Sequence, residues 1–224
     1  MLKTVVLNGW AASPSAWNLC RFRRDALFSY LDQLDGLPER FMEDAVLHGP
    51  AGSSVILVGW SMGGSCALRL ACRYPEAVKG LVLVAATPRM MEEKPSGWRG
   101  LSPRRLDALH RGLQLTHGAG FFGLPPGKPN PYQIDSDDNL ERGLEYLLET
   151  DLRASLEARA ASFRFPVAVF QSEHDGIVRP ENAGYLKGIF PGADVRYVPG
   201  TEHALPIFIP ELIDEAVSAI AESV

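Results

Sequence analysis

The sequence predicts an α/β fold in which a mainly parallel sheet is flanked by helices. Short apolar runs rich in β-branched residues alternate with segments of helical periodicity, the pattern of parallel strands joined by crossover helices. One run, at residues 55–58, leads directly into Gly-x-Ser-x-Gly and then into a helical segment. With 224 residues, of which 46% are hydrophobic, the chain can form one domain core together with an insertion.

The expected elements follow one another in the order of such a sheet. The strands are expected at residues 4–7, 26–31, 55–58, 81–85, 167–171 and 195–198. The helices are expected at residues 39–48, 65–74, 180–189 and 210–222. Prolines mark two boundaries, because Pro75 ends the helix before it, and Pro191 with Gly192 ends another.

The alternation breaks between residues 88 and 151. This segment is rich in proline and glycine, yet residues 103–115 and 138–148 keep a helical pattern. It starts after one expected strand and ends before another, where an insertion would leave and rejoin the sheet. A disordered linker is the alternative, but the segment has too many leucine and phenylalanine side chains for that. We therefore expect a core of residues 1–87 and 152–224 and an inserted helical cap, or lid, of residues 88–151.

Ser61 is the candidate nucleophile. It is the central residue of Gly59-Trp60-Ser61-Met62-Gly63, between an expected strand and an expected helix. A strained turn at this point lifts the serine hydroxyl above the end of the sheet. Glycine is needed on both sides, because a side chain there would collide with the neighbouring strand and helix. The context favours a nucleophile elbow over an ordinary glycine-rich turn.

A serine nucleophile needs a base and a carboxylate that orients the base. His203 is the candidate base, because it follows the last expected strand, and ligand sites form at such strand ends in open α/β sheets. Two carboxylates, Glu173 and Asp175, follow the preceding strand. We favour Asp175, because Gly176 frees the turn that would aim its side chain inward. Glu173 is the alternative, and either choice keeps the chain order serine, acid, histidine.

Backbone N–H groups near Ser61 and in the first loop are expected to stabilise an oxyanion. A tetrahedral intermediate carries a negative oxygen that needs such donors, and we expect them from Trp10 and Met62. The side chains expected to line the acyl pocket are Trp10, Ser61, Met62, Phe121, Phe122 and His203. These groups supply nucleophile, base and electrophile, so the sequence implies no metal and no organic cofactor.

Composition limits the partners and the compartment. The net charge of -5 argues against general nucleic-acid binding. No run approaches the roughly 18 apolar residues that a membrane span needs, and the first residues have the pattern of a core strand rather than of a signal peptide. The three cysteines show no metal-binding spacing. We expect a cytoplasmic protein that binds neither nucleic acid nor membranes.

Several segments together resemble one family. They include Asn8-Gly9-Trp10-Ala11, Gly59-Trp60-Ser61-Met62-Gly63-Gly64, Trp98-Arg99-Gly100 and Thr150-Asp151-Leu152-Arg153. These segments resemble the α/β-hydrolase superfamily, in particular the BioH-type pimeloyl-[acyl-carrier protein] methyl ester esterases of biotin synthesis. The resemblance implies hydrolysis of a carboxyl ester through an acyl-enzyme. Asn8 departs from the family pattern, which has a histidine at this position of the oxyanion loop.

The expected cap carries positive charge in an acidic chain. Residues 88–128 contain seven basic and three acidic side chains, a net charge of +4. Acyl carrier proteins, the partner that the resemblance implies, are strongly acidic, so a basic cap would steer one towards the pocket. A solvated cap surface is the alternative. The arginines expected to dock the carrier are Arg99, Arg104, Arg105 and Arg111.

Other functions use the same frame. A general short-chain esterase, a thioesterase, a C–C bond hydrolase or an eliminase of the menaquinone pathway would share the fold, and comparing oxygen esters with thioesters would identify a thioesterase. A non-enzymatic ligand receptor is a further alternative. The serine, aspartate and histidine set favours an enzyme over a receptor.

Overall fold

A parallel sheet forms the centre of the molecule. The computed structural model describes residues 1–47, 54–116, 127, 129–200 and 202–224. Within these residues, six strands pair in the order β2-β1-β3-β4-β5-β6, and all five pairings are parallel. The strands are β1 Leu2–Leu7, β2 Ala26–Phe28, β3 Ser54–Trp60, β4 Val78–Val84, β5 Val167–Ser172 and β6 Asp194–Val198. The predicted fold class is confirmed.

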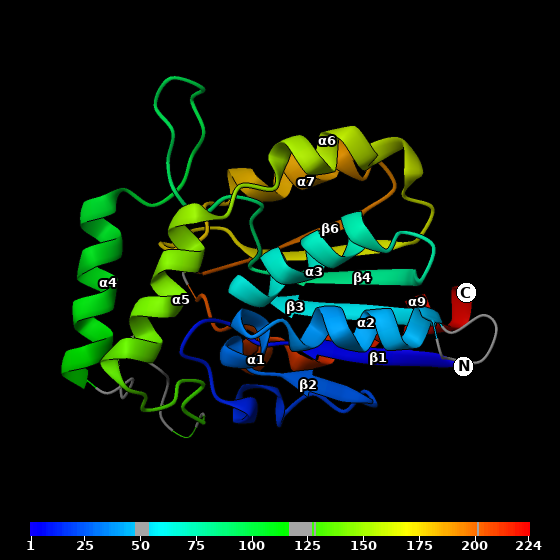
Figure 1. The fold of residues 1–224 in the computed structure, drawn as a ribbon, viewed down its shortest axis with the longest axis horizontal. Helices are drawn as coiled ribbons and strands as arrows, with labels where there is room; N and C mark the ends of the chain where they lie inside the picture. Colours follow the sequence, from blue (N-terminus) through cyan, green and yellow to red (C-terminus); the bar gives the residue numbers. More distant parts are fainter. Residues whose placement is uncertain (48–53, 117–126, 128, 201) are drawn as a thin grey trace.

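Helices cover both faces of the sheet (Figure 1). They are α1 Tyr30–Leu34, α2 Leu37–Leu47, α3 Met62–Arg73, α4 Pro103–Thr116, α5 Asp137–Glu149, α6 Arg153–Arg159, α7 Glu181–Ile189, α8 Leu205–Phe208 and α9 Pro210–Ser223, with short 3₁₀ turns η1 Pro14–Trp17 and η2 Ala160–Ser162. Alternate residues of β3 divide the core, because successive strand side chains point to opposite faces. Val55 and Leu57 pack with α2, α3, α6 and α7. Ile56 and Val58 pack with η1, α8 and α9 on the other face.

One expected strand is too long. Residues 26–31 were expected to form a strand, but β2 ends at Phe28 and α1 begins at Tyr30. The reason is a capping box, in which the Ser29 hydroxyl accepts from the Asp32 N–H at 3.2 Å and the Asp32 carboxylate accepts from the Ser29 N–H at 2.8 Å. These local bonds satisfy the first N–H groups of the helix and outweigh the apolar strand pattern. Helices α6 and α8 were not expected from the sequence.

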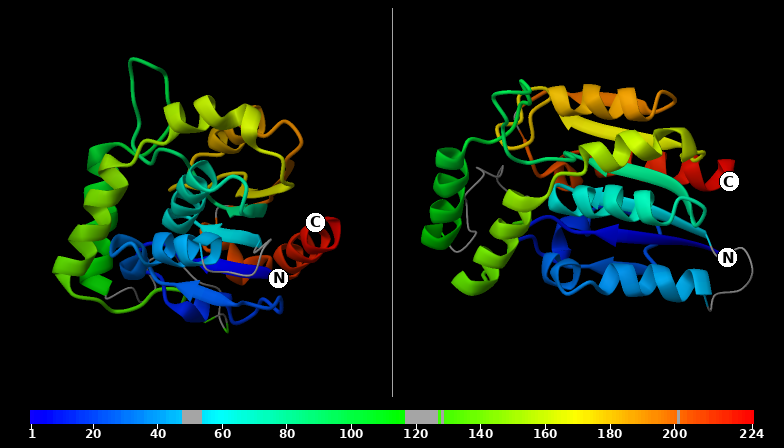
Figure 2. Two further views of the ribbon diagram at one scale, coloured as in Figure 1. Left: turned by 45° about the vertical axis from the view of Figure 1, so that its right-hand side comes forward. Right: turned by 45° about the horizontal axis from the view of Figure 1, so that its top comes forward.

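The described residues of the inserted segment, within 88–151, lie across the carboxyl ends of the strands. The segment carries α4 and α5, which stand side by side at that end of the sheet in both figures (Figures 1 and 2). A third apolar cluster joins it to the core, with Leu106 of α4 and Leu147 of α5 packing near Trp10 and Met62. The segment is therefore the layer that covers the end of the sheet where the elbow lies.

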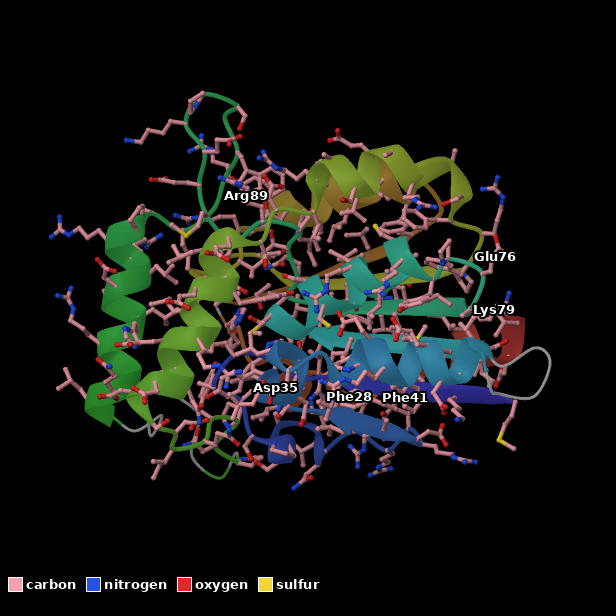
Figure 3. The ribbon with its side chains drawn as sticks, in the orientation of Figure 1. Phe28, Asp35, Phe41, Glu76, Lys79 and Arg89 are labelled. Carbon is pink, nitrogen blue, oxygen red and sulfur yellow. The ribbon has the colours of Figure 1, made fainter. Side chains whose placement is uncertain are left out.

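Ion pairs fasten the two ends of the inserted segment to each other. Arg89 bonds Asp151 at 2.6 Å, and Arg153 bonds both Asp151 at 2.7 Å and Glu93 at 3.0 Å. The Arg153 guanidinium also lies 5.1 Å from the centre of the Trp98 ring. Figure 3 shows Arg89 at the base of the loop that projects beyond α6. Trp98 and the Thr150–Arg153 stretch, both part of the family resemblance, thus meet in one cluster.

Candidate active site

The turn between β3 and α3 holds Ser61 in a strained backbone conformation. Its φ and ψ are 57° and -119°, a combination that non-glycine residues rarely adopt. The glycines on either side have no room for a side chain. A Cβ added to Gly59 would lie 2.5 Å from the Gly63 carbonyl oxygen, and one added to Gly63 would lie 2.0 Å from the Leu7 carbonyl oxygen. The elbow thus depends on close approach of α3 to β1.

The structure brings Ser61, His203 and Asp175 into one hydrogen-bonded chain. His203 Nε2 lies 2.9 Å from Ser61 Oγ, and His203 Nδ1 lies 2.8 Å from Asp175 Oδ2. All three residues are buried, with exposed fractions of 6%, 6% and 1%. Asp175 follows β5 and His203 follows β6, so the strand ends converge above Ser61. Glu173, the alternative acid, is exposed and is not among the partners of His203.

The Asp175 carboxylate is held by donors from its own turn. Its Oδ1 accepts from the backbone N–H groups of Ile177 at 2.7 Å and Val178 at 3.1 Å. Its Oδ2 lies 3.4 Å from the Gln171 side-chain amide as well as against His203. Hydrogen bonds of this kind stabilise a buried negative charge. The turn therefore holds the carboxylate in one orientation and leaves Oδ2 directed at the histidine.

The His203 backbone is fixed from the elbow side. Its carbonyl oxygen accepts from Trp60 Nε1 at 2.9 Å and from the Leu205 N–H at 2.9 Å. The Trp60 and His203 rings lie 5.9 Å apart at 44°. Because Trp60 precedes Ser61, the same short stretch of chain carries the serine and orients the histidine.

Two backbone N–H groups next to Ser61 are available for an anion. Within the described residues, neither the Trp10 N–H nor the Met62 N–H has an acceptor. Met62 opens α3, where the first N–H groups of a helix lack intrahelical partners. Trp10 lies in the turn that follows β1, and a Cβ added to the adjacent Gly9 would be 3.4 Å from Ser61 Cβ. Both groups thus belong to backbone that borders the serine.

The Trp10 side chain ties this turn to the inserted segment. Its indole N–H donates to the Leu140 carbonyl of α5 at 3.1 Å. Gly143, one turn further along α5, lets the helix approach, because an added Cβ would lie 2.4 Å from Trp10 Cδ1. The Trp10 ring also lies 6.2 Å from the His110 ring of α4.

An apolar pocket opens onto Ser61. The space between its walls, including the opening to solvent, is about 400 Å³. The walls are formed by Gly9, Trp10, Trp60, Ser61, Met90, Leu101, Leu106, Leu109, Tyr132, Leu147, Ile177 and His203. Of the expected pocket residues, Met62 is buried beside it in the Trp10 cluster, whereas Phe121 and Phe122 lie outside the described residues.

Most residues of the pocket wall were not predicted from the sequence. Met90, Leu101 and Leu147 belong to a segment whose leucines predicted helices but not the direction of each side chain. Tyr132 lies in a proline-rich stretch that has no periodic pattern. It pairs with Ala12 in an isolated bridge, its ring lies 6.1 Å from Trp60, and burial, with the nearby Asp175 charge, raises its pKa well above the usual value.

The four arginines expected to bind a carrier are exposed on the inserted segment. Arg99 lies before α4, and Arg104, Arg105 and Arg111 lie on α4. None of them forms an ion pair with another described residue, whereas Arg89 and Arg153 of the same region do. Side chains of α4 extend away from the sheet on its outer side (Figure 3).

Other groups offer little competing chemistry in the described part of the chain. Burial raises the pKa of the Cys66 and Cys20 thiols to about 12, and that of Cys72 to about 11, so these thiols are protonated near neutral pH. No group of three or more metal-ligating side chains occurs among the residues described. In the same ranges, no helix has the length and hydropathy to cross a membrane.

Comparisons with known proteins agree with the fold and with the family resemblance. Residues 39–209 match the family model of the α/β hydrolase fold. A pimeloyl-[acyl-carrier protein] methyl ester esterase of Pectobacterium atrosepticum is 28% identical over an alignment of 246 residues, which covers 98% of this chain and 94% of that protein. The protein of that name from Shewanella woodyi is 28% identical over 178 residues, covering 68% and 69%. An esterase structure from Exiguobacterium antarcticum shares the fold, with a TM-score of 0.73 at 17% identity over 99% of this chain and 92% of that one.

Proposed function

The chain belongs to the α/β-hydrolase fold family, and from that premise we propose that it is a serine carboxylesterase acting on the methyl ester of a pimeloyl group carried by an acyl carrier protein. The observation that carries the proposal is the pair of short contacts that His203 makes with Ser61 and Asp175, at 2.9 and 2.8 Å. The names of the relatives at 28% identity support the substrate.

In the proposed reaction, Ser61 Oγ attacks the ester carbonyl carbon while His203 Nε2 takes the hydroxyl proton. The carbonyl electron pair moves onto oxygen to give a tetrahedral oxyanion. When this intermediate collapses, the bond to the methoxy group breaks, and the leaving group takes the proton from His203 to form methanol. Water then attacks the acyl-enzyme by the same route, which releases the acid and returns the proton to Ser61. Asp175 stabilises the imidazolium formed in each half.

The N–H groups of Trp10 and Met62 are proposed to bind the oxyanion. Their support is that both border Ser61 and lack acceptors within the described residues. Donors of this kind are fixed before the charge develops, and loss of one lowers kcat by about 10²–10³ in serine hydrolases. Nucleophile, base and anion site come from the chain itself, so the proposed mechanism uses no cofactor.

The inserted segment is proposed to act as a cap over an acyl pocket. Leu106 and Leu109 of α4, Leu147 of α5, and Met90 with Leu101 give the pocket apolar walls. Such walls suit an unbranched alkyl chain, because its burial is favourable by about 0.8 kcal/mol per CH₂. The division into a core of residues 1–87 and 152–224 and a cap of residues 88–151 is part of this proposal.

The arginines on the cap are proposed to dock the carrier protein. Arg99, Arg104, Arg105 and Arg111 are exposed and have no carboxylate partner in the described part of the chain. Unpaired guanidinium groups on a surface attract an acidic partner and raise its rate of association. Leu106 and Leu109 of α4 line the pocket, so a carrier bound to α4 would bring its acyl group near Ser61.

The test is hydrolysis of pimeloyl methyl ester on acyl carrier protein beside a short p-nitrophenyl ester, with wild type and Ser61→Ala. We expect wild type to cleave both and Ser61→Ala to cleave neither while keeping the wild-type unfolding temperature. Cleavage of the short ester alone would indicate a general serine esterase. Cleavage of a thioester faster than of the oxygen ester would indicate a thioesterase. Ligand binding without turnover would indicate a receptor.

A further inference from the structure

The turn that carries the Trp10 N–H has a backbone that needs outside support. The Ala12 N–H donates to the Gly9 carbonyl at 3.2 Å, which closes a four-residue turn. Inside it Ala11 has a φ of 52°, in the left-handed region that favours glycine. Such a conformation persists only when the surroundings hold it. Trp10 precedes Ala11, so the direction of the Trp10 N–H depends on whatever holds this turn.

Asn8 supplies that support through both ends of its side-chain amide. Its Nδ2 donates to the Ala12 carbonyl at 3.0 Å, across the same turn. Its Oδ1 accepts from Trp17 Nε1 at 3.1 Å. Asn8 is completely buried, and Trp17 is too. Buried hydrogen bonds of this kind are costly to break, because the groups left unpaired cannot form hydrogen bonds with water instead.

The partners of Asn8 leave only one orientation for its amide. An indole N–H can only donate and a backbone carbonyl can only accept. The oxygen of the side chain must therefore face Trp17, and the nitrogen must face Ala12. A carboxylate at this position would keep the bond from Trp17 Nε1 but would place a negative oxygen against the Ala12 carbonyl.

The Asn8 backbone is fixed against the elbow. Its carbonyl oxygen accepts from Gln33 Nε2 at 2.8 Å, and its N–H donates to the Phe28 carbonyl at 3.0 Å. The same carbonyl would lie 2.7 Å from a Cβ added to Gly63, the residue after Met62. Asn8 thus lies between the two stretches of backbone that carry the candidate oxyanion donors.

We propose that Asn8 is a positioning residue: its side-chain amide holds the turn that directs the Trp10 N–H at the oxyanion. This inference rests on the proposed ester hydrolysis and concerns the transition state rather than the bound substrate. Loss of the Nδ2 donor frees the turn at Ala12, so the Trp10 N–H moves off the oxyanion. Binding of groups that make no oxyanion is unaffected, because the Trp10 indole stays bonded to the Leu140 carbonyl of α5 and the other pocket walls, apart from Gly9, lie outside this turn.

The test uses Asn8→Asp, which keeps the size of the side chain and removes the Nδ2 donor. Hydrolysis of p-nitrophenyl butyrate is measured with inhibition by butylboronic acid, whose serine adduct has a tetrahedral oxyanion, and by butan-1-ol, which is neutral and forms no such adduct. Asn182→Asp is the matched control, because it removes a buried asparagine Nδ2 bond, to Thr87 Oγ1 at 3.0 Å, away from the turn. Trp17→Phe, which removes the partner of Oδ1, is the second variant should Asn8→Asp fail to fold.

We expect Asn8→Asp to lower kcat/KM by about 10- to 100-fold, to weaken inhibition by butylboronic acid by a similar factor and to leave inhibition by butan-1-ol unchanged. Trp17→Phe shifts the ratio of the two inhibition constants in the same direction as Asn8→Asp, and Asn182→Asp does not shift this ratio. The inference is overturned if Asn8→Asp binds butylboronic acid as tightly as wild type, or weakens both inhibitors equally. A wild type as inactive as Ser61→Ala would overturn the proposed function as well, whereas an active wild type with an equally active Asn8→Asp would overturn this inference alone.

Discussion

Replacing Gly143 with alanine should destabilise the protein, because α5 packs on Trp10 at this point. Gly143 is buried in α5, and a Cβ there would lie 2.4 Å from Trp10 Cδ1, 2.6 Å from Trp10 Nε1 and 3.3 Å from Tyr30 Cδ2. The indole cannot turn aside freely, since its N–H is bonded to the Leu140 carbonyl at 3.1 Å. The methyl group must therefore push α5 and the turn at Trp10 apart.

Two opposing effects set the size of the change. Alanine is favoured over glycine inside a helix by about 1 kcal/mol, whereas an extra methyl group forced into a packed interior costs about 1–3 kcal/mol. Gly184 is the matched control, because it lies exposed inside α7 and an added Cβ would meet nothing within 4 Å. Gly184→Ala should gain the helix preference alone. The free energies of unfolding of the two variants should therefore differ by about 1–3 kcal/mol.

Urea unfolding of wild type, Gly143→Ala and Gly184→Ala measures this difference directly, provided that the three share one slope against urea. In a chain of this size about 1 kcal/mol corresponds to roughly 2–4 °C in unfolding temperature. We also expect Gly143→Ala to lower esterase activity, because the displaced indole belongs to the residue whose N–H is proposed to bind the oxyanion. The reasoning fails if Gly143→Ala is as stable as Gly184→Ala.

Three further changes test other parts of the structure. Asp175→Asn should lower kcat/KM by roughly 10⁴ at unchanged unfolding temperature, and a loss below about tenfold in steady-state assays would contradict its proposed role. Arg104→Glu with Arg105→Glu should slow hydrolysis of the carrier-bound ester, most at low salt, and spare a short ester; equal loss on both substrates would argue against docking there. Hydrogen bonds from Arg153, then Arg89, lower the pKa of Asp151 from 3.8 to about 2. Its contribution to stability is therefore present above pH 3.8 and lost as the pH falls through about 2. Between pH 5 and pH 2, the unfolding temperature should fall less steeply for Asp151→Asn than for wild type. Parallel curves of unfolding temperature against pH would refute this.

Much of the fold could be predicted because its causes are local. The buried strands β3, β4 and β5 are runs of β-branched and apolar residues with few other stable arrangements. The elbow is equally local, since a Cβ on Gly59 would lie 2.5 Å from the carbonyl oxygen of Gly63, four residues later in the chain. The order of Ser61, Asp175 and His203 along the chain then narrowed the candidates for acid and base to those that follow β5 and β6.

The end of β2 and the place of Tyr132 were not predicted from the sequence, and both have a physical reason. The end of β2 depended on two hydrogen bonds of Ser29 and Asp32 that compete with an apolar run. Tyr132 reached the pocket through a bridge to Ala12, 120 positions earlier in the chain, and no periodicity foretells such a contact.

Residue types and their spacing were enough to indicate the parallel sheet, the strained serine and the chemistry that three side chains could perform, because these follow from sterics within a few residues. The pocket walls, the contact of α5 with Trp10 and the close approach of Asn8 to the start of α3 depend on the packing of distant segments. His203 and Ser61 are 142 positions apart, and only the folded chain sets the 2.9 Å between His203 Nε2 and Ser61 Oγ. Distances of that kind are fixed by many weak packing contacts between distant segments, and these contacts form only in the tertiary structure.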